Sequence, residues 1–161
     1  FYGVPRGHLR ILACETSACD RRLGGRGAAA VTYSLGPVSV VRLAPRGLSQ
    51  TILTHELAHT ETHARLGVIG QIRGRLPAWM DEGLSVLVSD DPRYLGPATG
   101  AARCLRAPRA ALPASTFDWA RMAARDHGLY AEAACAVVHW AEENGGLAAL
   151  RARIHSGAVL P

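Results

Sequence analysis

The chain has 161 residues, of which 48% are hydrophobic and 19% charged, and its formal net charge is +5. This length is typical of one domain, and the composition excludes intrinsic disorder, which requires low hydrophobicity combined with high net charge. No apolar run approaches the roughly 18 residues of a membrane span, so no transmembrane segment is predicted. We therefore expect a single domain over residues 1–161.

The positive charge is concentrated in the first third of the chain. Residues 1–50 contain seven Arg, one Asp and one Glu, whereas residues 51–161 contain eleven Arg and eleven acidic residues. The Arg residues stand singly or in pairs, with few aromatic residues between them and no groove-binding motif, so we expect no nucleic-acid partner. The alternative is an anionic-polymer binder, whose binding would depend strongly on salt.

Four cysteines occur, at positions 14, 19, 104 and 135. Of the three possible pairings, the sequence favours the one that joins Cys14 to Cys19, with buried free thiols as the alternative. A cysteine zinc site is not expected because the chain contains no CxxC. The close cysteine pair and a first residue other than Met favour a periplasmic or secreted bacterial protein.

The first third is predicted to form strands and the remainder helices. Three short segments, 8–14, 28–35 and 38–44, are rich in Val, Ile, Leu and Tyr, and the Gly36-Pro37 pair predicts a hairpin between the last two. Segment 14–27 has the composition of a loop.

Helical periodicity begins at Ser49, a candidate N-cap, and the first helix is expected to end at Gly67. A second helix is expected from Pro77 to position 88, followed by an irregular connection over 92–114 and by helices over 116–125, 129–144 and 147–155. This order predicts an α+β domain whose small antiparallel or mixed sheet precedes a helical part. Residues assigned to core packing are Trp119, Val137, His139, Trp140 and Leu150.

The strongest functional signal is the HExxH sequence at residues 55–59. Chance would produce it about 0.013 times in a chain with seven His and seven Glu. Residues i and i+4 lie on one helix face, so His55 and His59 can both bind a single Zn²⁺. Glu56 is rotated by about 100° and can reach a water at the ion, which makes it the candidate general base.

A catalytic zinc site usually has a third protein ligand. His63 lies about 12 Å along the helix axis from His55, which is too far to share the ion. Most of its helical neighbours are polar, so we predict a surface histidine there. The better candidate is Glu82 in PAWMDEGLS, because a carboxylate on a second helix can approach the ion from the side. Gly83 beside it would allow the two helices to approach closely.

HELAH, followed after 22 residues by the Glu of WMDEGLS, resembles the gluzincin zinc peptidases, which carry HExxH and a downstream Glu within a W-x-x-E-G pattern. The sequence is most similar to their compact peptidase-MA-like or minigluzincin type. The specific match covers residues 55–88, and a looser one extends to the C-terminus.

The resemblance implies a zincin-like fold in which the edge strand of a hairpin, here 38–44, lies along the substrate cleft. It implies His55, His59 and Glu82 as Zn²⁺ ligands and Glu56 as the base that activates zinc-bound water. The expected function is hydrolysis of peptide bonds in a peptide or protein substrate. Aminopeptidase relatives bind a free amine through a Gly-x-Met-Glu-Asn segment that this sequence lacks, so an endopeptidase is favoured. The alternative is an inactive, zinc-stabilised scaffold or recognition domain.

Several gluzincins also use a Tyr or His beyond the glutamate helix to donate a hydrogen bond to the tetrahedral intermediate. Tyr130 is the candidate for this role and His127 its rival, while a half-buried core Tyr is the alternative for Tyr130. Asp81 and Asp118 are the candidate carboxylates for orienting the histidines.

Overall fold

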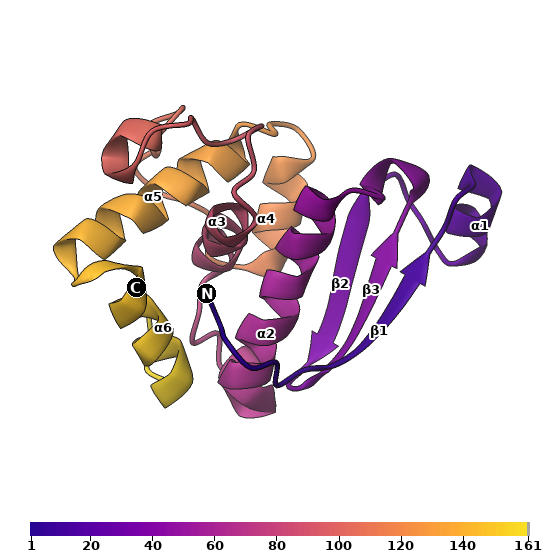
Figure 1. Ribbon diagram of the computed structural model, residues 1–161, viewed down its shortest axis with the longest axis horizontal. Coiled ribbons are helices and arrows are strands. Elements are labelled where there is room, and N and C mark those ends of the chain that lie inside the picture. The colour runs from indigo at the N-terminus through magenta and orange to yellow at the C-terminus, as the bar shows by residue number, and fades with distance from the viewer. Residues whose placement is uncertain (161) are drawn as a thin grey trace.

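The computed structural model describes residues 1–160 and confirms an α+β architecture. A three-stranded sheet lies at one end of the molecule, α2 runs across it, and α3 to α6 lie on the far side of α2 (Figure 1). The candidate site is formed where α2 packs between the sheet and α3.

The strands are β1 (His8–Ala13), β2 (Ala30–Leu35) and β3 (Val38–Leu43). Their order is β1-β3-β2, with β3 parallel to β1 and antiparallel to β2, so the sheet is mixed. The predicted hairpin forms, with Gly36 at a positive φ of 56° in its turn. The expectation that 38–44 is an edge strand is wrong: β3 is central because β1 pairs along its second side, and β1 and β2 are the two edge strands.

One face of the sheet packs against α2. In the β2–β3 pairing, Thr32 lies opposite Val41 and Ser34 opposite Ser39, and Val41 and Ser39 are buried. Tyr33 and Leu35, on the other face of β2, are 57% and 59% exposed. Alternation along β2 therefore directs two hydroxyl side chains toward α2.

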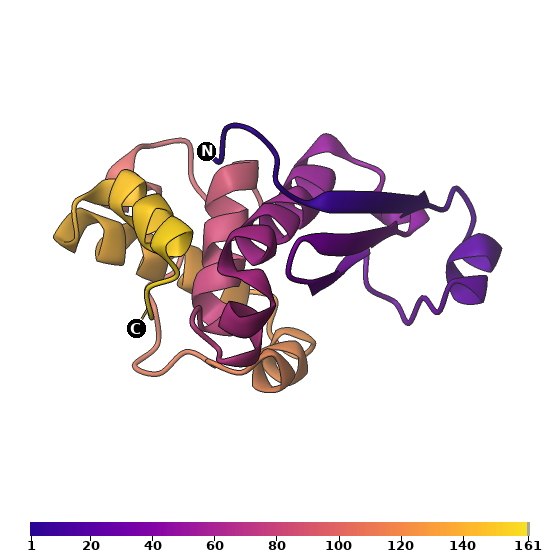
Figure 2. The ribbon, with the colours of Figure 1, turned by 90° about the horizontal axis from the view of Figure 1, so that it is seen from below.

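Segment 14–27, predicted to be a loop, contains the short helix α1 (Ser17–Arg22), which protrudes beyond the end of the sheet (Figure 2). Thr16 caps it by accepting a hydrogen bond from the Cys19 amide. The predicted Cys14–Cys19 disulfide joins α1 to β1, and Asp20 forms a buried ion pair with Arg42. These tertiary links stabilise a helix too short to form on propensity alone.

The long helix α2 (Gln50–Ile72) begins at Ser49, whose hydroxyl accepts a hydrogen bond from the Ile52 amide at 3.2 Å. Regular helix is interrupted at Gly67, where φ is 66° and ψ is 172°, so the predicted end of the first helical segment is confirmed. A short 3₁₀ turn (Pro45–Gly47) precedes this helix.

The second long helix, α3 (Ala78–Ser89), starts directly after Pro77 and is capped at its C-terminus by Asp90, which adopts a left-handed conformation with φ 47°. Gly83 lies against α5: a Cβ built there would meet the carbonyl oxygen of Ala133 at 2.4 Å. The expected close approach of the two site helices at Gly83 is therefore wrong, because the glycine faces the opposite neighbour.

The C-terminal part contains α4 (Thr116–Ala123), α5 (Leu129–Glu143) and α6 (Gly146–Ser156). Trp119, Val137 and Leu150 are buried and Trp140 packs against the core, as predicted. His139 is exposed, so its assignment to the core is wrong. Within residues 1–160, none of the helices combines the length and apolarity that crossing a bilayer requires.

The connection between α3 and α4 is irregular apart from a short 3₁₀ turn (Gly100–Arg103). A disulfide from Cys104 to Cys135 attaches it to α5, so the structure has no free thiol among the described residues. Glu132, only 2% exposed, adds ion pairs to Arg109 at 2.5 Å and Arg106 at 2.8 Å. The local sequence pattern does not predict this second anchor.

Candidate metal centre

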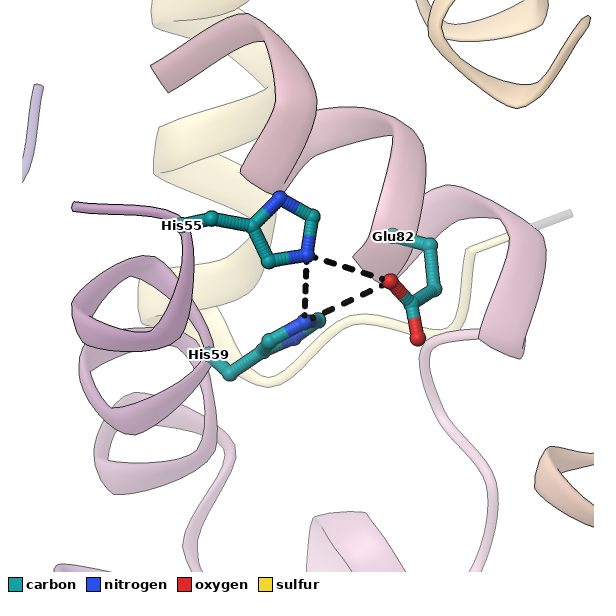
Figure 3. Close-up of side chains that lie close together, drawn as sticks. All are labelled: His55, His59 and Glu82. Carbon is teal, nitrogen blue, oxygen red and sulfur yellow. Dashed lines mark hydrogen bonds and ion pairs between the residues drawn. The ribbon is translucent and has the colours of Figure 1, made fainter. Parts of the chain in front are cut away.

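Three side chains from α2 and α3 converge on one point (Figure 3). The Nε2 atom of His55 lies 3.1 Å from Nε2 of His59 and 3.3 Å from Oε2 of Glu82. The distance from His59 Nε2 to Glu82 Oε2 is 3.5 Å. The helical i, i+4 spacing supplies the two imidazoles, and α3 supplies the carboxylate.

These distances fit a tetrahedral zinc ion. Ligand atoms about 2.05 Å from Zn²⁺ at tetrahedral angles lie roughly 3.3–3.4 Å from one another. The three measured separations, 3.1, 3.3 and 3.5 Å, bracket that value. Two imidazole nitrogens and one carboxylate oxygen are also a donor set that zinc accepts, with a fourth position left for water.

Hydrogen bonds and charge hold the three side chains of this centre together. Burial alone would raise the pKa of Glu82, but the charges of His59 and His55 and their hydrogen bonds outweigh it and lower the pKa to about 2. Burial likewise opposes protonation of His59, yet the Asp81 and Glu82 carboxylates raise its pKa well above the usual range. Binding of a metal ion would therefore displace a proton from this centre.

Glu56, the candidate base, is buried beside the three candidate ligands and held by β2. The Thr32 hydroxyl donates a hydrogen bond to Glu56 Oε2 at 2.6 Å and lies 3.3 Å from the Glu56 carbonyl oxygen. Sequence analysis missed Thr32, although the period of two along β2 places it on the face toward α2.

Asp81 accepts hydrogen bonds from two histidines. His59 Nδ1 donates to Asp81 Oδ2 at 2.9 Å, and His63 Nε2 donates to the same oxygen at 3.0 Å. Burial alone would raise the pKa of Asp81, but His59 and His63 lower it far below its usual value. The prediction of a surface position for His63 is wrong: its side chain is 22% exposed and bonded on both sides.

Asp118, the other candidate carboxylate, does not contact the histidines. Its side chain is 48% exposed near the start of α4, where it interacts with the Ser115 hydroxyl at 2.8 Å and Arg121 at 3.1 Å. The expectation that it orients a histidine is therefore wrong.

Tyr130 lies against the centre, with its ring centroid 6.2 Å from that of His55. Its ring stacks on Tyr94 at 5.1 Å and meets the Trp119 ring edge-on at 5.2 Å. Burial, together with the Glu82 charge, raises the pKa of the Tyr130 hydroxyl well above its usual value. Tyr94 is a second phenol of this wall that sequence analysis missed.

The centre opens into a cleft of about 1320 Å³. One wall is formed by residues 26–32 at the start of β2 and another by residues 114–130, including Tyr130 and the exposed His127. Glu56 and the three clustered side chains lie between these walls. The free edge of a sheet and a candidate metal centre thus share one cleft.

Comparison with known proteins finds no matching family model, no similar curated protein and no similar solved structure. The functional interpretation rests on the sequence motif and on the geometry of the centre.

Proposed function

We propose that the protein is a zinc-dependent metallopeptidase with a zincin-like fold, of the gluzincin type and with endopeptidase specificity. The observation that carries the proposal is the tetrahedral spacing of His55, His59 and Glu82 beside a buried Glu56. A purely structural zinc site would be closed by four protein ligands, whereas this donor set has three and opens into the cleft.

The residues of the centre match the steps of peptide hydrolysis. A Zn²⁺ held by the three ligands would lower the pKa of a bound water to about 7 and polarise the scissile carbonyl. Glu56 would accept the proton of the attacking water and pass it to the leaving amine. The Tyr130 hydroxyl, which its raised pKa keeps protonated, would donate a hydrogen bond to the developing oxyanion.

The substrate backbone would bind along β2. This strand has one unpaired edge, and Ala30, Val31 and Thr32 line the cleft. Extended peptides commonly add to such an edge through main-chain hydrogen bonds. Thr32 would then link β2, the strand that binds the substrate, to Glu56, the general base.

The proposal is tested by Glu56→Gln, measured by zinc content after purification without added metal and by casein cleavage. We expect the variant to retain one zinc and to lose about 10²–10⁴-fold in turnover, because the amide cannot accept the proton. A chelator should abolish the wild-type activity. Equal cleavage by the variant would contradict the mechanism, and wild-type protein with zinc but no cleavage would support the scaffold alternative.

A further inference from the structure

The contacts of Asp81 extend beyond the metal centre. One of its oxygens, Oδ2, accepts from both His59 and His63, while Oδ1 is buried without a hydrogen-bond partner in the described part of the chain. Asp81 therefore has no further hydrogen bond that fixes its side chain. Its orientation depends on the two histidines.

The orientation of Asp81 matters for metal binding. A histidine that binds a metal through Nε2 must carry its proton on Nδ1, and an acceptor at Nδ1 fixes both this tautomer and the ring. Asp81 is that acceptor for His59, at 2.9 Å. The hydroxyl of Ser85 lies 3.2 Å from the same nitrogen.

His63 is anchored on its other side. The Ser34 hydroxyl of β2 donates a hydrogen bond to His63 Nδ1 at 2.8 Å. Both ring nitrogens are thus engaged, and neither is directed at the atoms that would bind the ion. The His59 and His63 rings stack one helical turn apart, with centroids 6.0 Å apart.

We infer that His63 is a positioning residue of the metal centre, which acts through Asp81 to hold His59 in its metal-binding orientation. The hydrogen bonds run from Ser34 on β2 to His63 on α2, then to Asp81 on α3 and back to His59 on α2. The inference rests on the proposed zinc site and assigns His63 no contact with the ion or the substrate.

The test compares zinc dissociation constants, obtained by competition with a chromogenic chelator, for His63→Ala and His63→Gln. Loss of an acceptor that orients a ligating histidine weakens metal binding by about 10–100-fold, and His63→Ala, which acts on that acceptor, should weaken it by about 10-fold. His63→Gln should restore most of the affinity, because its amide N–H can donate to Asp81. His139→Ala, which removes an exposed histidine of α5, should bind zinc like the wild type.

Circular dichroism shows whether each variant is folded. Should His63→Ala fail to fold, Ser34→Ala provides the second test, with a smaller loss of affinity in the same direction. An unchanged dissociation constant in the folded variants would overturn the inference. So would a second zinc equivalent in the wild type that His63→Ala loses, because His63 would then be a ligand.

The affinity measurement does not depend on peptide cleavage. A wild type that binds zinc without cleaving peptides would refute the proposed function, and the variants' dissociation constants would still decide the role of His63. A wild type that binds no zinc would overturn both.

Discussion

Tyr130 and His127 line the same cleft, but their surroundings differ. The Tyr130 ring is packed between aromatic side chains and lies beside His55, whereas His127 is exposed in the turn before α5. A packed ring holds its hydroxyl in one place, which a hydrogen-bond donor to a transition state requires. The packed position of Tyr130 beside His55 thus favours it over His127 as the candidate oxyanion donor.

Replacement of Tyr130 by Phe removes the hydroxyl and keeps the ring. We expect this change to lower kcat by about 10²–10³-fold, since that is the usual effect of deleting an oxyanion donor. His127→Ala is the matched variant and should retain most activity. Steady-state kinetics on one peptide measures both; a larger loss of kcat in His127→Ala would reverse the assignment.

At the scale of single residues, the HExxH spacing predicted which atoms converge, because i and i+4 share a helix face. It could not predict the partners of those atoms. The prediction of a surface position for His63 rests on its polar neighbours along the helix and on its distance from His55, and neither of these reports contacts with other elements. Its partners, Asp81 and Ser34, lie on two other elements, and only their packing shows that His63 is bonded on both sides.

At the scale of elements, the position of Glu82 depends on how α3 packs. The Gly83 Cα lies against the α5 backbone, where an added Cβ would be 2.4 Å from the Ala133 carbonyl oxygen. Because this contact is with backbone, no side-chain rotation can relieve it. Close packing against α5 therefore fixes the helix that bears the third candidate ligand.

Gly83→Ala should destabilise the protein. Alanine is favoured over glycine in a helix by about 1 kcal/mol, but overpacking typically costs about 1–3 kcal/mol, and a clash with backbone lies at the upper end. We expect a net decrease in the free energy of unfolding, measured with urea in the presence of a chelator. Gly96→Ala, where the nearest atoms are 3.5 Å away, is the control. Equal stability of the two variants would show that α3 can shift.

The elements themselves were largely predictable. The periodicity of strands and helices, and the Gly and Pro residues at their ends, can be read from residues close together in the sequence. The order of the strands was not. The hairpin of β2 and β3 is a local feature, but the parallel pairing of β1 with β3 joins segments about 30 residues apart. That pairing makes β3 central and leaves β1 and β2 as the edge strands.

At the scale of the whole molecule, the positive charge of residues 1–50 falls partly on the cleft. Arg26 and Arg46 line it, are exposed, and have no ion pair within the described residues. Arg42, in contrast, is buried and paired with Asp20. A substrate in the cleft would therefore meet two positive charges that no ion pair neutralises.

A peptide bearing Glu residues should be cleaved faster than its Gln analogue. We expect a several-fold higher kcat/KM at low salt and a smaller difference at high salt, since screening shortens the range of exposed charges to about 10 Å at 0.1 M. The double variant Arg26→Gln, Arg46→Gln should remove the preference. Arg10→Gln, in the same third of the chain but outside the cleft, should keep it. Identical rates for both peptides would leave the charge without a role in recognition.

Successive side chains of β2 point to opposite faces of the sheet, so the two sets of residues are constrained differently. Thr32 and Ser34 face α2, where their hydroxyls hold Glu56 and His63, while Tyr33 and Leu35 face away and are exposed. If the residues of β2 are randomised and active variants are selected, these variants should carry substitutions at every second position only. Positions that activity requires would then alternate along the strand with positions that accept substitution.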